Sequence, residues 1–263
     1  MAASAVAAAA AGGTGGVFRA IFHAAVLAYY YYVDHLLTVG VGRVHLELGR
    51  AADDPEILRW RSGIPYYFTF WNLILHKVYF TCCCIDNLSE CFSFYGPIKL
   101  QKTAQTVRRI LFSSLFFPYM LLVVINFWAL AFYDPDLVFV QYLYAGPSWV
   151  NHACHTFILP IVLLEMYLRA GTDEPWGKGT YLPFFILQAF NLAYGITGAS
   201  SVILRGCWPY PVFDLMSKGE IIMFYIYVHV SSTIWLWLHN YLVNNVWGTQ
   251  RGTSKPSVKK KAN

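Results

Sequence analysis

Six continuous apolar stretches, each long enough to cross a lipid bilayer, constrain the fold of this chain more than any other feature. About 20 residues of α-helix span the roughly 30 Å hydrocarbon layer of a membrane. With approximate bounds, the stretches are Val17–Val39, Ile64–Ile85, Arg109–Tyr133, Pro147–Met166, Tyr181–Leu204 and Glu220–Trp247. The sequence therefore predicts an all-α fold, a polytopic transmembrane bundle of about six spans.

The composition agrees with a membrane protein. Hydrophobic residues make up 57% of the chain and charged residues only 13%, whereas about 25% of a soluble domain is charged. We expect a disordered Ala/Gly tail over residues 1–16, a six-span membrane domain over residues 17–247 and a basic cytosolic tail over residues 248–263. The net charge of +5 needs no nucleic-acid partner, because basic tails commonly meet anionic lipid at a membrane surface.

The distribution of basic residues predicts the orientation. Cytoplasmic segments of membrane proteins carry an excess of Lys and Arg, and the excess here favours both termini in the cytosol. The chain ends in Lys260, Lys261, Ala262 and Asn263, which is similar to the dilysine signal that retrieves proteins to the endoplasmic reticulum. The alternative is an ordinary basic tail beside the membrane.

A stripe of polar residues interrupts the fourth apolar stretch, residues Pro147–Met166. Ser148, Asn151, His152 and His155 recur at helical spacing and so fall on one face. Polar side chains at membrane depth are costly and face a cavity or a partner helix. The stripe is consistent with helices held together by hydrogen bonds, the more common role of such residues; the alternative is a general base inside the membrane.

A second stripe in the Ile64–Ile85 stretch lies at a matching depth. Thr69 and Asn72 share a helix face, and in the predicted topology Thr69 and His155 lie roughly 8 and 10 Å below the same membrane face, at 1.5 Å of rise per residue. A threonine hydroxyl is inert as a nucleophile without a nearby base. Thr69 and His155 are therefore candidate catalytic residues.

Three asparagines are candidates for a supporting role. Asn72, Asn126 and Asn151 could orient the histidine or stabilise an oxyanion, while His152 is a further possible member of the site.

The same polar residues are also consistent with two alternative roles. Membrane threonines frequently bond to a carbonyl of their own helix, and Thr69 could do the same. His152 and His155 could share a metal ion, but no third ligand follows at a fixed spacing. We therefore predict neither a metal nor a cofactor.

Several motifs resemble one protein family. They are WVNHACHTFILPI from Trp149, YFTFWNL around Thr69, FFPYMLLVVINFW ending at Trp128, WPYPVF from Trp208 and LVNNVWGTQ at the end of the last span. On these motifs, which extend over roughly residues 60–250, the chain resembles the androgen-induced gene 1 and androgen-dependent TFPI-regulating protein family.

The resemblance implies a multi-span membrane enzyme of the endoplasmic reticulum that hydrolyses fatty acid esters of hydroxy fatty acids. The family's threonine nucleophile and histidine partner fall on Thr69 and His155. The implied partner is a lipid ester supplied by the bilayer. One alternative is a non-enzymatic membrane scaffold or signalling regulator. Another is a transporter, which would show internal repeat symmetry, and none is evident in the sequence.

Overall fold

A computed structural model describes residues 13–47, 62–91, 98–138, 148–169 and 181–247, together with the single residues 49, 51, 53 and 58. Within these residues the fold is entirely helical, and the expected all-α class is confirmed. The tails expected before residue 17 and after residue 247 fall largely outside this part of the chain, as does the Lys260–Lys261 signal.

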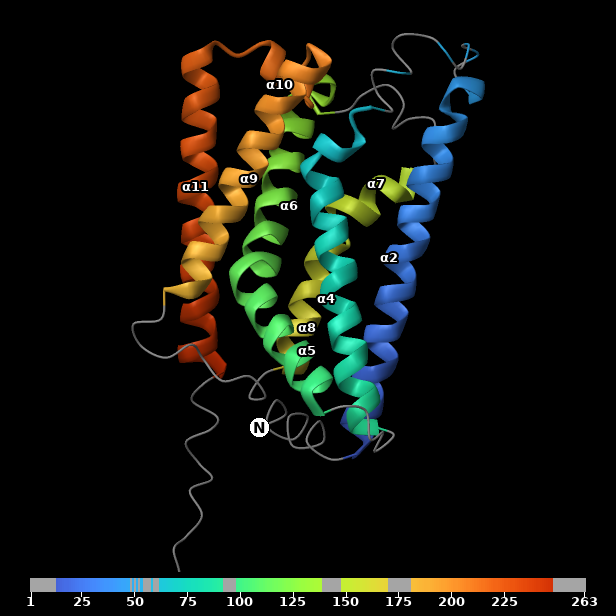
Figure 1. Cartoon of the computed structure of the whole chain (residues 1–263), viewed down its shortest axis with the longest axis vertical. Coiled ribbons are helices and arrows are strands. Elements are labelled where there is room, and N and C mark those ends of the chain that lie inside the picture. The colour runs from blue at the N-terminus through green and yellow to red at the C-terminus, as the bar shows by residue number, and fades with distance from the viewer. Residues whose placement is uncertain are drawn as a thin grey trace, which may run out of the picture.

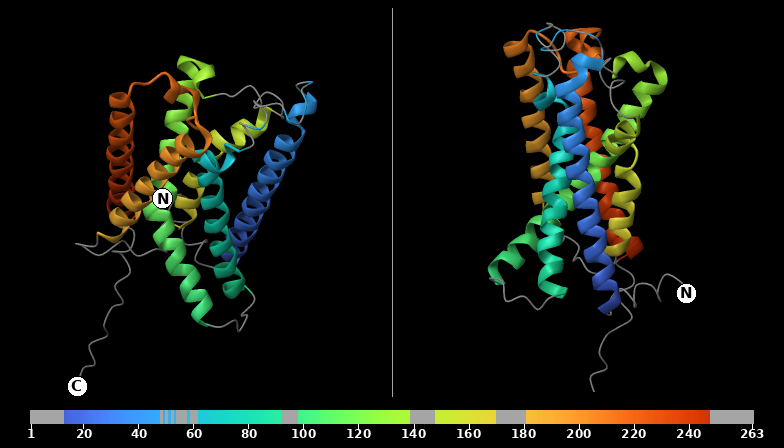
Figure 2. Two further views of the ribbon diagram at one scale, coloured as in Figure 1. Left: turned by 45° about the horizontal axis from the view of Figure 1, so that its top comes forward. Right: turned by 90° about the vertical axis from the view of Figure 1, so that its right-hand side faces the viewer.

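The helices form an upright bundle (Figures 1 and 2). In chain order they are α2 (Gly13–Glu47), the 3-10 turn η1 (Ile64–Tyr66), α4 (Phe68–Cys91), α5 (Ile98–Leu111), η2 (Phe112–Phe116), α6 (Phe117–Tyr133), η3 (Pro135–Leu137), α7 (Ser148–His155), α8 (Ile158–Arg169), α9 (Leu182–Arg205), α10 (Pro211–Asp214), α11 (Lys218–Tyr241) and η5 (Leu242–Trp247).

Successive helices run along the bundle in opposite directions (Figure 1). Helix α2 ascends and α4 descends beside it, α6 ascends, α8 descends, α9 ascends and α11 descends. The short helix α7 lies obliquely near the upper end and contacts α2, α4 and α6. This placement brings the polar residues of α7 to the start of α4.

Aromatic side chains dominate the core between α2, α4 and η2. Tyr30, Tyr79, Phe80 and Phe116 are fully buried, and the rings of Tyr79 and Phe116 stack at a centroid distance of 4.2 Å. Large aromatic side chains each bury about 150–250 Å² of surface, so this cluster holds the lower half of the bundle together.

In the described part of the chain, four segments are long and apolar enough to cross a membrane: Phe68–Asn87, Leu100–Tyr133, Leu182–Arg205 and Lys218–Val246. They support an integral membrane protein, with candidate spans at α4, α5–α6, α9 and α11. The number falls short of the expected six. Helix α2 has 35 residues, but it is not apolar enough to count among these segments. Helices α7 and α8, with 8 and 12 residues, are each too short to cross a membrane alone.

The expected single helix over Pro147–Met166 is interrupted at Thr156 and Phe157. The backbone N–H groups of both residues donate to the carbonyl of His152, each at 2.8 Å, which ends α7 before α8 begins. Pro160 explains the break, because a proline has no N–H and its ring clashes with the carbonyl four residues earlier, here that of Thr156.

Pro118, within the third apolar stretch, is accommodated without a break in the helix. The five residues before Phe117 make a π turn, and the N–H of Phe117 bonds to the carbonyl of Phe112. Such a turn frees the carbonyl that the proline ring would otherwise meet. The helix from Ile98 to Tyr133 therefore continues past Pro118 without a stop.

Candidate active site

Thr69 and His155 lie in direct contact, as the sequence predicts. Thr69 is the second residue of α4 and His155 the last residue of α7. Their Oγ1 and Nε2 atoms are 3.0 Å apart, within hydrogen-bonding distance. Helix α7 ends at His155 because of the Pro160 break, so the ring stands at a helix end directly opposite the first turn of α4.

The partners of His155 assign its proton. The ring Nδ1 lies 3.0 Å from the main-chain oxygen of Asn151 and 2.8 Å from the Asn151 side-chain oxygen. A carbonyl oxygen only accepts, so Nδ1 carries the hydrogen of the neutral ring and Nε2 has a free lone pair. The Thr69 hydroxyl therefore donates to His155 Nε2.

Two aromatic residues of α6 fix the position of the histidine. Its ring stacks on Phe127 at 3.6 Å between centroids and 8° between planes. The indole N–H of Trp128 donates to the main-chain oxygen of His155 at 3.1 Å. Stacking and hydrogen bonding together leave the buried ring one orientation, with Nε2 facing Thr69.

The remaining predicted residues occupy different positions. Asn151 and Asn126 line the cavity beside the pair, but the Asn126 amide donates to the carbonyl of Leu122 at 2.7 Å. Asn72 is buried and its side-chain oxygen has no protein partner. His152 is exposed, bonds to the Thr156 hydroxyl at 3.1 Å and does not line the cavity. Of these four residues, Asn151 is the one that hydrogen-bonds to the Thr69–His155 pair.

A cavity of about 410 Å³ opens onto Thr69 and His155. Its other lining residues are mostly apolar: Leu37, Ile64, Phe68, Phe70, Leu122, Val123, Phe127, Leu130, Val138, Val150, Val212, Phe213, Phe224 and Val228. Ligand pockets typically have volumes of about 300–1,000 Å³ and combine apolar walls with a few polar groups. The cavity suits an acyl chain with one reactive group near Thr69.

Tyr210 is a site residue that the sequence did not reveal as one. It lies in the loop between α9 and α10, and its hydroxyl oxygen accepts the N–H of Phe68 at 2.8 Å. The adjoining Thr69 also interacts with this hydroxyl through its backbone and side chain. Burial raises the pKa of the Tyr210 phenol, so the group remains protonated at neutral pH. The only sequence signal was a tyrosine held between Pro209 and Pro211.

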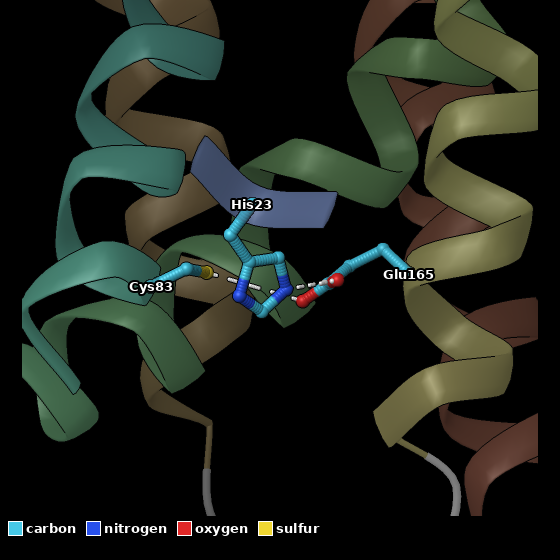
Figure 3. A group of neighbouring side chains, drawn as sticks. All are labelled: His23, Cys83 and Glu165. Atoms are coloured by element: carbon cyan, nitrogen blue, oxygen red, sulfur yellow. Dashed lines mark hydrogen bonds and ion pairs between the residues drawn. The ribbon is translucent and has the colours of Figure 1, made fainter. Parts of the chain in front are cut away.

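A second polar cluster lies deep in the bundle, towards its lower end (Figure 3). His23, Cys83 and Glu165 are all buried, and their potential metal-ligating atoms lie within 4.8 Å of one another. His23 Nε2 lies 2.7 Å from Glu165 Oε2, and Tyr79 donates to Glu165 Oε1 at 2.6 Å.

These groups fit a hydrogen-bonded network better than a metal site. The Asn87 amide lies 2.5 Å from His23 Nδ1, so both ring nitrogens already have partners. The Arg169 guanidinium is 3.6 Å from Glu165 and would lie beside any bound cation. The network links α2, α4 and α8, and we assign no metal to it.

Comparison with known proteins identifies relatives over most of the chain. The family model described as FAR-17a/AIG1-like protein matches residues 18–244. The androgen-dependent TFPI-regulating protein of Mus musculus is 32% identical, over 91% of this chain and 96% of its own length; its Homo sapiens counterpart is 31% identical, over 89% and 96%. The androgen-induced gene 1 protein of Homo sapiens is 26% identical, over 76% and 84%. No solved structure matches the chain.

Proposed function

The chain belongs to the FAR-17a/AIG1-like protein family, and from that premise we propose that it is an intramembrane hydrolase of fatty acid esters of hydroxy fatty acids. The observation that carries the proposal is the 3.0 Å contact between Thr69 and His155 at the wall of an apolar cavity. A hydroxyl beside an oriented base is the arrangement that nucleophilic catalysis requires.

In the proposed reaction, His155 Nε2 takes the proton of the Thr69 hydroxyl as Oγ1 attacks the ester carbonyl carbon. The ester C–O bond then breaks, and the departing hydroxy fatty acid receives the proton from His155. This leaves the fatty acyl group on Thr69. Water attacks the acyl carbon, gives its proton to His155 and releases the fatty acid as the proton returns to Thr69.

Asn151 completes a Thr–His–Asn arrangement in this proposal. Its side chain and its main-chain carbonyl hold the hydrogen on Nδ1 of His155, which is the role of the third member in other catalytic triads. The apolar cavity receives the acyl chain, since an ester dissolved in the bilayer is already at the depth of the site.

We further propose that α2 and the broken pair α7–α8 complete a six-span domain with both termini in the cytosol. Helix α2 extends along the bundle beside α4, and the shorter α8 packs against α6 (Figure 1); α4 and α6 belong to segments that qualify as spans. The dilysine-like end, Lys260 and Lys261, is consistent with residence in the endoplasmic reticulum.

Substitution of the pair tests the activity directly. Thr69→Val keeps the shape and removes the nucleophile, and we expect it to abolish hydrolysis of a hydroxy-fatty-acid ester in membranes, normalised to protein amount. His155→Ala should lose as much, and the double variant little more, because groups that act as a unit are strongly non-additive. Thr69→Ser should retain part of the activity.

His152→Ala is the matched control on the same helix. His152 lies three residues from His155 but is exposed and does not line the cavity, so turnover per molecule should stay close to wild type. Labelling by a lipophilic fluorophosphonate should disappear with Thr69→Val and persist with His152→Ala. Wild-type turnover by Thr69→Val would exclude the threonine mechanism.

A regulatory role without catalysis is the second candidate, because relatives matched over about nine-tenths of this chain are named as TFPI-regulating proteins. In that case the Thr69–His155 contact would serve helix packing. Thr69→Val would then leave the cellular function intact, and no fluorophosphonate labelling would be observed.

A further inference from the structure

We infer that Tyr210 is a catalytic residue, whose hydroxyl donates to the oxyanion that forms when Thr69 attacks an ester carbonyl. The inference rests on the proposed hydrolase activity and names the donor that this activity needs. Attack on a carbonyl places negative charge on its oxygen, and a fixed donor at that position is commonly among the largest contributions to catalysis.

The three asparagines expected to stabilise the oxyanion either hydrogen-bond to other groups or lie outside the cavity wall. The Asn126 amide donates to the carbonyl of Leu122, and the Asn151 side chain bonds to Nδ1 of His155, on the side of the ring away from Thr69. Asn72 does not line the cavity. Besides His155, Tyr210 also lines the cavity and interacts with Thr69, and its hydroxyl accepts the N–H of Phe68 next to it.

The start of α4 holds the phenol oxygen in place. The first N–H groups of a helix have no partner within it, and here the N–H of Phe68 donates to Tyr210 at 2.8 Å while the backbone of Thr69 also bonds to it. Donors to a hydroxyl oxygen polarise its own O–H bond and make it a stronger donor.

The Tyr210 hydrogen is directed towards the reacting atoms. The Thr69 proton is committed to His155 Nε2, so the lone pairs of Thr69 Oγ1 are left for the Tyr210 hydroxyl, which interacts with Thr69. The Tyr194 hydroxyl also interacts with Tyr210; because it donates its own hydrogen to the carbonyl of Tyr66 at 3.1 Å, its oxygen is a second acceptor for the resting proton. A donor within reach of Oγ1 is also within reach of a carbonyl oxygen whose carbon Oγ1 attacks.

The loop around Tyr210 is rigid enough to fix a donor. Gly206 ends α9 with a φ of 70°, a left-handed conformation that favours glycine. Pro209 and Pro211 restrict the backbone on either side of Tyr210, and the Ser201 hydroxyl donates to the carbonyl of Cys207 at 2.9 Å. A donor held before the reaction needs no reorganisation during it.

Tyr210→Phe tests this role by removing one oxygen atom. We expect kcat for ester hydrolysis to fall by about 10²–10³, the cost of losing one oxyanion donor, with KM little changed. A long-chain trifluoromethyl ketone, which forms a tetrahedral adduct with Thr69, should lose a similar factor in affinity. An unreactive ether analogue of the substrate should bind as tightly as to the wild type.

Tyr119→Phe is the matched control. Tyr119 is another buried tyrosine, hydrogen-bonded to Asn191, and it does not line the cavity. This variant should keep wild-type kcat per folded molecule.

The outcomes separate the inference from the proposed function. Wild-type kcat in Tyr210→Phe, with Thr69→Val inactive, would overturn the role of Tyr210 and leave the hydrolase proposal standing. Loss of ether binding together with kcat would also overturn it, because the tyrosine would then shape the cavity. Full activity of Thr69→Val would instead refute the proposed function itself.

Discussion

At the scale of single residues, the orientation of His155 depends on Asn151. The variant Asn151→Leu removes the acceptor at 2.8 Å but leaves the main-chain acceptor at 3.0 Å. We therefore expect kcat to fall by roughly 10- to 100-fold, less than the about 10⁴-fold loss when the buried acid of a serine-protease triad is changed to an amide. The measurement is ester hydrolysis at saturating substrate, with His152→Leu as the neighbouring control. Unchanged kcat in Asn151→Leu would show that the main-chain carbonyl alone orients the ring.

The sequence could reveal some of these residues and not others. Thr69 and His155 were predictable because each belongs to a polar stripe on an apolar helix and the two stripes share a depth. The separate tasks of Asn72, Asn126 and Asn151 were not predictable, since spacing gives the helix face but not the hydrogen-bond partner. Tyr210 lies in a loop without periodicity, so only the folded chain places its hydroxyl beside Thr69.

At the scale of helices, apolar length and periodicity predicted α4, α9 and α11 within a few residues. The break between α7 and α8 was missed because apolar side chains favour a continuous span, whereas the backbone conflict comes from Pro160 alone. The break is also what places His155 at a helix end. The steric effect of Pro160 therefore sets the helix boundary beside His155, although the hydropathy of residues Pro147–Met166 predicts one continuous helix.

The network of Glu165 gives a prediction at this scale, because it joins three helices around one buried carboxylate. Glu165→Leu would leave the buried Arg169 guanidinium and the His23 ring without their shared partner. Removing one member of a buried ion pair costs about 3–5 kcal/mol, so the unfolding temperature in detergent micelles should drop markedly. Glu165→Gln retains an acceptor for Tyr79 and should lose less. Equal stability of Glu165→Leu and wild type would show that the network does not hold α2, α4 and α8 together.

At the scale of the whole molecule, the chain contains one N-glycosylation acceptor sequence, Asn87–Leu88–Ser89, but it does not report the orientation of the chain in the membrane. Its side chain is 3% exposed and its amide bonds to His23, so a glycan is excluded on either side of the membrane. We expect no mobility shift on glycosidase treatment of the membrane-expressed protein, and none from Asn87→Gln. A mobility shift on glycosidase treatment would show that Asn87 is accessible in the lumen before the helical bundle has folded.

The topology is better tested at the two loops that pack together at the upper end of the bundle. Leu137 of η3 and Phe213 of α10 belong to one hydrophobic cluster. If both α8 and α9 cross the membrane, Asp136 and Leu215 lie on the same side; if only α9 crosses, they lie on opposite sides. Both positions are exposed, Leu215 at 75%, so Asp136→Cys and Leu215→Cys can be labelled without disturbing the core.

In sealed microsomes with the cytosolic face outward, both cysteine variants should resist a membrane-impermeant maleimide and react only after permeabilisation. The parent chain, without either substitution, serves as the control for background labelling of the natural cysteines. The natural cysteines in the described helices and loops are buried or half-buried. Labelling of one variant but not the other in sealed vesicles would contradict six spans and would require the packed cluster of Leu137 and Phe213 to separate. Labelling of both variants before permeabilisation would be consistent with two crossings by α8 and α9 but would show the opposite orientation. The basic C-terminal tail and its terminal lysines would then lie in the lumen.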